Sequence, residues 1–241
     1  MKRYLLESSL IIVSVLLSLS IDSYLEKKSR LNQKNVILKE LKESILIDKD
    51  QLKEVIDVQK KCFNSAGILI NDFNNKVKLS QEELVKNFSS LKQNGIVSFF
   101  PQMGPFLRLL NTGSMELISS DDLRSKLLII YDNLNRRKEF GDRVMDDFGM
   151  DFGRDLSQFI VVTERKVDKR NLIYLIPERK IENFTINKNY YKSELVLFYY
   201  SEYRIWIETF ISMYRNYLDL LDATTKLIDF EISKNKFIWS N

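Results

Sequence analysis

The fold of this protein is decided by residues 31–69, which read LNQKNVILKELKESILIDKDQLKEVIDVQKKCFNSAGIL. The stretch has no proline and one glycine, so nothing in it stops an α-helix. Written as heptads, it has four consecutive aliphatic a positions, Leu31, Leu38, Ile45 and Leu52. Lys34 and Asp48 occupy d positions, where they would disrupt a clean two-stranded coiled coil. The pattern predicts a long amphipathic helix within residues 25–79 that packs in an intramolecular bundle, with a parallel coiled coil as the alternative.

The composition of the 241-residue chain narrows its possible functions. With 7 glycines and 3 prolines, turns and phosphate-binding loops are scarce and long helices are favoured. The chain has no histidine and a single cysteine, Cys62, which excludes His-based catalysis, His-ligated metals and an internal disulfide. A net charge of +4 gives no basic footprint for nucleic acid. We therefore predict a protein that is not an enzyme, holds no metal or cofactor and binds no nucleic acid.

The N-terminus has the pattern of a membrane element. Lys2 and Arg3 precede an apolar run over residues 4–21, which as a helix is roughly 27 Å long, close to the thickness of a bilayer's hydrocarbon core. We predict an uncleaved transmembrane helix within residues 1–24, so that the lipid bilayer is one partner. A cleaved signal peptide and a buried helix of a soluble protein are the alternatives. Basic residues flank both ends of the run, so the expected location, the bacterial inner membrane with a periplasmic domain, is open in its sidedness.

Residues 80–158 are predicted to be helical with one corner. Ser80 and Glu83 form a capping box that opens a helix. The corner comprises Asn111, Thr112, Gly113, Ile118 and Leu123. Its glycine can take a positive φ and end one helix, and residues 119–122 (SSDD) cap the next, which we expect to run to about residue 148.

The last third of the chain combines an irregular stretch with a final helix. Residues 159–162 and 172–176 have strand propensity, so residues 159–189 contain either a short β-hairpin near 159–176 or an extended loop. Residues 190–241 predict a long helix with an aromatic stripe, Tyr199, Tyr203, Trp206, Phe210, Tyr214 and Tyr217. The stripe fits a core face, and the alternative is an interaction surface for a ligand or a partner.

Two short motifs suggest chemistry that the rest of the chain does not support. Residues 147–149 and 151–153 both read DFG, the magnesium-binding tripeptide of protein kinases, but the chain has neither the glycine-rich loop nor the HRD motif. Asp146, Asp147, Asp151 and Asp155 are not spaced like the ligands of a calcium-binding loop. We interpret both motifs as features of a helix end.

The apolar N-terminal run and residues 109–127, which read LLNTGSMELISSDDLRSKL, together resemble a family of uncharacterised, Bacteroidetes-like bacterial membrane proteins. The resemblance covers about residues 4–60 and 106–132. It departs from the family at residues 22–24 (DSY), where the family has Asn-Trp. It implies a single-pass protein with a helical domain beyond the membrane, and it implies no particular activity.

The sequence as a whole predicts an all-α fold in which a transmembrane helix continues into an elongated antiparallel helical bundle. We expect a membrane-anchored structural or interaction protein, a component or scaffold of a membrane-associated assembly with protein partners or further copies of itself. The alternative is a helical ligand-sensing domain that signals through a partner.

Overall fold

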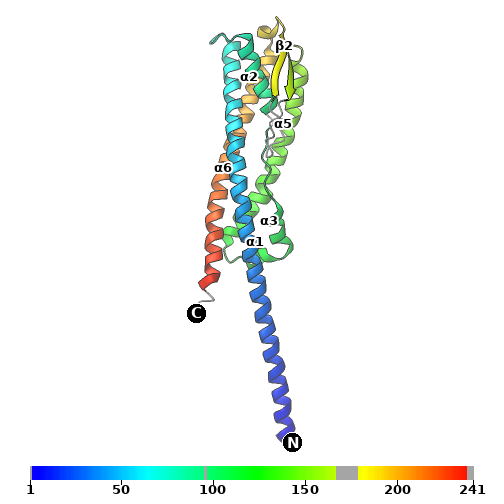
Figure 1. The fold of residues 1–241 in the computed structure, drawn as a ribbon, viewed down its shortest axis with the longest axis vertical. Helices are drawn as coiled ribbons and strands as arrows, with labels where there is room; N and C mark the ends of the chain where they lie inside the picture. Colours follow the sequence, from blue (N-terminus) through cyan, green and yellow to red (C-terminus); the bar gives the residue numbers. More distant parts are fainter. Residues whose placement is uncertain (1, 95–96, 167–178, 238–241) are drawn as a thin grey trace. The chain divides into compact units, whose positions relative to one another are not determined.

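The structure is a computed structural model that describes residues 2–94, 97–166 and 179–237, with the side chains of residues 10–93, 97–165 and 179–234. The described chain is mostly helical and carries one two-stranded antiparallel sheet (Figure 1). The predicted helical fold with a short hairpin is therefore confirmed. The chain divides into two compact units, and the long helices α1 (Lys2–Phe73) and α6 (Glu194–Phe237) each contribute to both.

Helix α1 follows the heptad pattern. From Lys34 onward every a and d position is buried, namely Lys34, Leu38, Leu41, Ile45, Asp48, Leu52, Val55, Gln59, Cys62, Ala66 and Leu69. The helix ends at Phe73, earlier than the predicted boundary at residue 79. The reason lies in Asn75, whose φ of 58° is left-handed and ends the helix, as asparagine tolerates better than most residues. The side chain of Asp72 then accepts a hydrogen bond from the backbone of Leu79 at 2.8 Å.

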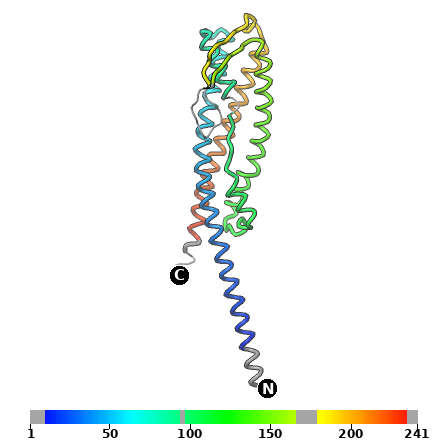
Figure 2. Tube along the Cα trace, turned by 45° about the vertical axis from the view of Figure 1, so that its right-hand side comes forward, coloured from blue at the N-terminus to red at the C-terminus, as the bar shows by residue number. Residues whose placement is uncertain are grey.

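Unit 1 comprises Met1–Ile45, Gln102–Leu127 and Thr224–Asn241. It contains the first part of α1, α3 (Gly104–Asn111), η1 (Ser114–Leu117), most of α4 (Asp121–Leu128) and the end of α6. Lys34 pairs with Glu231 and Lys42 pairs with Asp229, so residue numbers rise along α1 as they fall along α6. The two helices are therefore antiparallel, and they lie side by side in both ribbon views (Figures 1 and 2).

Unit 2 comprises Leu46–Pro101 and Leu128–Ala223. It contains the rest of α1, α2 (Gln81–Asn94), η2 (Ile129–Leu134), α5 (Asn135–Leu156), β1 (Ile160–Lys166), β2 (Arg179–Ile186), η3 (Tyr190–Lys192) and the start of α6. The predicted capping box opens α2: the backbone N–H of Glu83 donates to the Ser80 hydroxyl at 3.2 Å, and the Glu83 carboxylate accepts from the Ser80 N–H at 2.9 Å. The Ser80 hydroxyl also donates to the Glu83 carboxylate at 3.0 Å, and the two bonds that the carboxylate accepts from Ser80 hold the pKa of Glu83 below its ordinary value.

The predicted helix from residue 123 to residue 148 is wrong in its bounds. The chain instead forms α4, one stretch of π-helix in η2, and α5, which continues to Leu156. A π turn leaves a backbone carbonyl to be satisfied from outside the helix, and here Tyr217 of α6 donates its hydroxyl to the Ile130 carbonyl at 3.2 Å. Helix α5 extends past Phe148 because Phe152, one turn later, is fully buried against Tyr203 at a ring distance of 4.8 Å.

The hairpin exists, but its second strand lies later than predicted. Ile160 pairs with Ile186, and the pairing continues to Lys166 opposite Arg179, with a shift of register between the pairs Thr163–Asn183 and Glu164–Ile181. The predicted second strand, residues 172–176, falls outside the described residues. The final helix begins at Glu194 rather than residue 190 because residues 190–192 form a 3-10 turn and Ser193 is extended.

Candidate functional site

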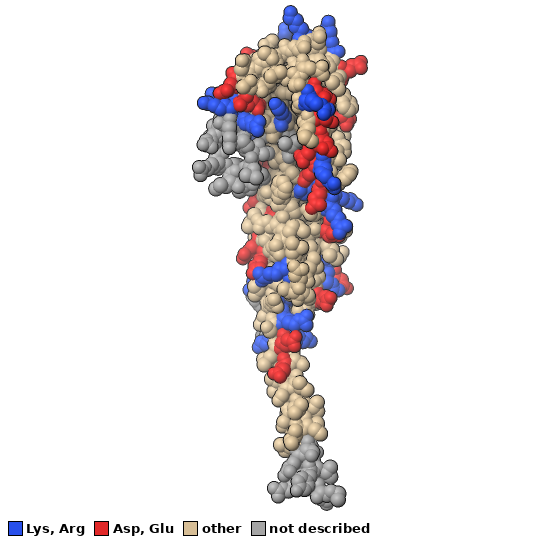
Figure 3. Space-filling model, turned by 90° about the vertical axis from the view of Figure 1, so that its right-hand side faces the viewer, with Lys and Arg blue, Asp and Glu red and all other residues tan. Residues whose placement is uncertain are grey.

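The N-terminal part of α1 is a helix whose described side chains are exposed. Every residue from 10 to 30, here called the exposed segment, is exposed, and its apolar side chains between residues 10 and 25 show 53–65% of their surface. Ser14 and Ser20 turn their hydroxyls onto the carbonyls of Leu10 and Leu16, each at 2.8 Å, so they offer little polarity outward. In the space-filling view the described tip of this segment carries no charge (Figure 3).

The exposed segment bears on the predicted transmembrane helix. Within the described part of the chain, no helix is long and apolar enough to cross a membrane. The structure therefore does not support the transmembrane helix predicted for residues 1–24. Residues 4–9 of the predicted apolar run lie outside the residues whose side chains are described.

The corner after α3 has the predicted backbone geometry. Gly113 has a φ of 65°, and the Thr112 N–H and hydroxyl both donate to the Arg108 carbonyl, at 3.1 and 2.9 Å. Ile118 and Leu123 are buried while Asn111 is exposed. The left-handed glycine ends α3 and lets the chain turn through η1, so that Ile118 packs into unit 1 before α4 begins.

Directly after this corner lies a buried ion pair. The Nζ atom of Lys34 is 2.7 Å from Oε1 of Glu231, and both side chains are only 1% exposed. The backbone N–H and the hydroxyl of Ser119 also donate to this carboxylate, at 2.9 and 2.7 Å, and Lys34 reaches the Leu117 carbonyl at 3.4 Å. Burial alone would raise the pKa of Glu231, but these bonds and the charge of Lys34 together lower the pKa below its ordinary value.

Sequence reasoning missed the ion pair but noticed one of its members. Lys34 stood out as a lysine at a d position of the heptads, where an apolar residue belongs. Such a residue signals a buried partner of opposite charge, because a lone buried ammonium is costly. The partner is separated from it by 197 residues, and no local pattern identifies it.

The aromatic stripe of α6 faces the interior of unit 2. Five of its six predicted residues are buried, and Trp206 is half-buried. The rings meet aromatic residues from other elements: Tyr203 meets Phe148 of α5 at 5.0 Å, and Tyr217 meets Phe99 at 5.3 Å. In this conformation the stripe contributes packing area to the core of unit 2.

The single thiol belongs to the same interior. Cys62 of α1 is fully buried and points its Sγ atom at the Ser90 carbonyl at 3.6 Å. Burial raises the pKa of the Cys62 thiol to about 12. At neutral pH it is a neutral packing side chain rather than a nucleophile.

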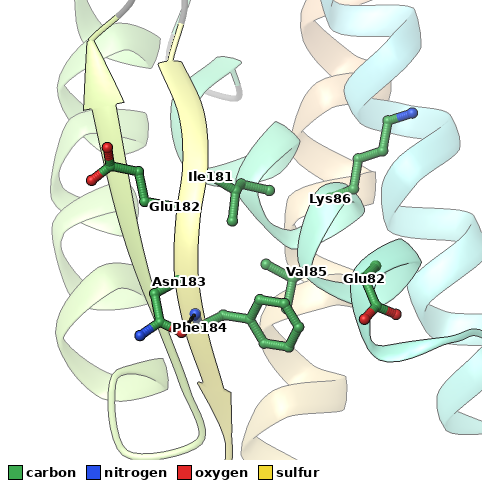
Figure 4. A pocket seen from close by; sticks show the side chains of 7 residues that line it. All are labelled: Glu82, Val85, Lys86, Ile181, Glu182, Asn183 and Phe184. Atoms are coloured by element: carbon green, nitrogen blue, oxygen red, sulfur yellow. Dashed lines mark hydrogen bonds between the residues drawn. The ribbon is translucent and has the colours of Figure 1, made fainter.

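A small pocket lies between α2 and β2 (Figure 4). Its volume is about 400 Å³, and Ile181 and Phe184 of β2 point toward Val85 of α2. The charged residues among those that line it are Glu82, Lys86 and Glu182. The pocket could receive an apolar side chain or a small apolar molecule. The sequence did not reveal it because β2 lies beyond the predicted hairpin.

The DFG tripeptides and the nearby aspartates form no metal centre within the described residues. No three Cys, Asp or Glu side chains among these residues are grouped in a way that could hold an ion. Both DFG tripeptides lie inside α5, with Phe148 and Phe152 packed on Tyr199 and Tyr203. Asp155 instead accepts a hydrogen bond from the Tyr199 hydroxyl at 2.6 Å.

Comparisons of the chain with protein-family models, with curated proteins and with solved structures return no match.

Proposed function

We propose that this protein is held at a bacterial inner membrane by the N-terminal part of α1, and that its helical units serve as a structural or interaction component of a membrane-associated assembly. The observation that carries the proposal is the exposed segment. Its eleven large apolar side chains, Leu10, Ile11, Ile12, Val13, Val15, Leu16, Leu17, Leu19, Ile21, Tyr24 and Leu25, each show more than half of their surface.

Such a surface is unfavourable in water. Exposed apolar area costs about 25 cal/mol per Å², and contiguous patches of several hundred Å² mark contact with a membrane or a partner. On its N-terminal side the segment is preceded, in sequence, by five apolar or serine residues, 4–6 and 8–9. In the proposal, residues 4–21 insert into the bilayer, and Tyr24, Lys27 and Arg30 lie at the level of the lipid headgroups.

A role in an assembly is supported by apolar side chains on the outside of unit 2. Phe198 and Ile205 of α6 are 53% and 56% exposed and lie seven residues apart, hence on one face of the helix. Exposed aromatic and aliphatic residues on a common face are typical of surfaces that contact other proteins.

The membrane half of the proposal is tested by fractionation. The full chain with a C-terminal tag is expected to stay in membranes washed with high salt and with alkaline carbonate. The double variant Ile12→Lys/Leu16→Lys is expected to move to the soluble fraction with its helix content intact, because neither side chain packs on the described units. Phe140→Lys is the matched control, since Phe140 of α5 is 65% exposed, against 59% for Ile12 and 58% for Leu16, and its substitution should not affect the fractionation.

Two further readouts separate the alternatives. The intact mass of the membrane-bound protein distinguishes an uncleaved anchor from a cleaved signal peptide. Protease treatment of spheroplasts should remove the C-terminal tag if the units are periplasmic. Release of the wild-type protein by the salt wash, or retention of the Ile12→Lys/Leu16→Lys variant, would contradict membrane anchoring.

The assembly half is tested separately. Phe198→Glu/Ile205→Glu should reduce the size of the detergent-solubilised complex in native electrophoresis while the protein remains in the membrane. The control is Arg204→Glu/Glu208→Arg, which changes two exposed charged residues on either side of Ile205 in the sequence. An unchanged complex size in the first variant would count against a role for this face.

A further inference from the structure

The aliphatic stripe of α1 does not by itself define how far α1 and α6 slide along each other. Leu38, Ile45 and Leu52 repeat every seven residues and are all fully buried. Against this stripe alone, moving the part of α6 in unit 1 by one or two turns would exchange one aliphatic contact for another of the same kind. Apolar packing of this sort tolerates alternative registers, and coiled coils commonly use a single buried polar residue to exclude them.

The Lys34–Glu231 pair is a buried polar contact of this kind in unit 1. Lys34 occupies a d position of the α1 heptads, and Glu231 continues the buried row Leu221, Thr224 and Ile228 of α6 in steps of three and four residues. In the observed register the carboxylate receives three donors, from Lys34 and from both polar groups of Ser119. In a register shifted by one turn, Glu231 would lie among the aliphatic residues of α1 and lose Lys34.

The corner after α3 also contributes to the position of Glu231. Ser119 directly follows buried Ile118, and Arg124 donates to the Ile118 carbonyl at 2.6 Å, so the donors of Ser119 have a fixed position. Glu231 therefore bonds both α1 and the start of α4. Helix α1, helix α6 and the start of α4 thus meet at the Glu231 carboxylate. Its α1 partner, Lys34, lies three residues after Leu31, the first described residue of α1 that is partly buried.

We propose that Lys34, Glu231 and Ser119 form a register latch, which holds α6 and the corner at one axial position on α1 where the exposed segment leaves unit 1. The latch selects the register and contributes little to overall stability. A shifted register buries an unpaired carboxylate, whereas replacing such a pair with uncharged residues is often neutral for stability. The other α1–α6 pairs, Lys42–Asp229 and Lys49–Asp222, have aspartates more than half exposed and can re-pair after a slip.

The test measures register directly in the full-length, detergent-solubilised protein. Cys62, the only cysteine, is first replaced by alanine. Lys42→Cys/Asp229→Cys then reports the observed register, and Lys42→Cys/Ser233→Cys reports a slip of one turn of α6. A short bis-maleimide bridges each pair, and mass spectrometry gives the bridged fraction. With the latch intact, the observed-register pair is expected to bridge at least about tenfold more than the slipped pair.

Lys34→Met/Glu231→Gln removes both charges, and its glutamine can still accept from Ser119. We expect this variant to keep its helical circular dichroism while the bridging ratio falls at least about threefold, because a 0.65 kcal/mol loss of preference corresponds to that factor. Lys49→Met/Asp222→Asn removes an exposed pair between the same two helices and should leave the ratio unchanged.

Three results would overturn the proposal. The first is an unchanged ratio in Lys34→Met/Glu231→Gln. The second is an equal fall in the Lys49→Met/Asp222→Asn control. The third is loss of helical structure in Lys34→Met/Glu231→Gln, because the pair would then be needed for folding itself rather than for choosing the register.

Discussion

The ammonium of Lys34 and the carboxylate of Glu231 lie 2.7 Å apart with only 1% of either side chain exposed, so each neutralises a charge that the interior would otherwise exclude. We predict that Lys34→Met alone lowers the free energy of unfolding by about 3–5 kcal/mol, because it leaves an unpaired buried carboxylate. Lys34→Met/Glu231→Gln should cost much less. Urea unfolding followed by circular dichroism gives the free energy of unfolding of the wild type, the two single variants and the double variant. Additive effects of Lys34→Met and Glu231→Gln would contradict the prediction.

A second prediction concerns the backbone of the corner. Gly113 has a φ of 65°, which costs a residue with a Cβ atom about 1–2 kcal/mol. The space around it is open, since the nearest atom to an added Cβ is a nitrogen of Arg30 at 3.9 Å. Gly113→Ala should therefore destabilise the protein through the backbone alone. Gly113→Asn should be milder, because asparagine enters this region more readily, and equal effects of the two substitutions would contradict the assignment.

A third prediction compares two glycines of α5. A Cβ atom on Gly141 would lie 2.9 Å from Cζ of buried Phe210, whereas a Cβ atom on Gly153 would meet nothing within 4 Å. Gly153→Ala should raise the free energy of unfolding by up to about 1 kcal/mol through helix propensity. Gly141→Ala should instead lower the free energy of unfolding by ~1–3 kcal/mol relative to the wild type, because overpacking outweighs the gain in helix propensity.

Shortening the opposing ring isolates the cause of the Gly141 effect. In Gly141→Ala/Phe210→Leu the added methyl group has room, so the penalty of the alanine should be smaller than in the wild-type background. Thermal unfolding of the four proteins of this cycle measures the coupling. Strict additivity would mean that the two helices do not approach each other here as closely as the structure has them.

The sequence predicted most of what depends on local pattern. The heptads of residues 31–69 gave the buried face of α1, the Ser80–Glu83 motif gave the start of α2, and Gly113 gave the positive φ of the corner. These features follow from spacing and from the conformations that single residues allow. The end of α1 at Phe73 was missed, because an asparagine at residue 75 is a weaker stop signal than a glycine.

What the sequence did not predict depends on contacts between distant residues. The π turn at Ile130 is supported by Tyr217, and the charge of Lys34 is balanced by Glu231. Neither partner can be identified without knowing how α1, η2 and α6 pack. The pocket beside α2 was missed for the same reason, since its second wall is a strand whose register only the fold defines.

The last prediction concerns alkaline pH and the hydrogen bond from Tyr199 to Asp155, with a length of 2.6 Å. Burial and this bond raise the pKa of the Tyr199 phenol to about 12, whereas an unfolded tyrosine titrates near ~10. The folded state therefore retains the proton to a higher pH than the unfolded state does. The contribution of the phenol to stability is complete below pH ~10 and is lost as the pH rises through about 12.

Tyr199→Phe tests this linkage because it removes only the hydroxyl. Other buried tyrosines also ionise at high pH, so the useful quantity is the difference in unfolding free energy between the wild type and Tyr199→Phe. That difference should be constant between pH 7 and ~10 and then shrink toward pH ~12. In an Asp155→Asn background the decline should still begin near pH ~10, which the unfolded state sets, but it should end at a lower pH, because Tyr199 no longer donates to a carboxylate and its folded-state pKa is raised less. A difference that stays constant through pH 12 would show that the phenol does not titrate with folding.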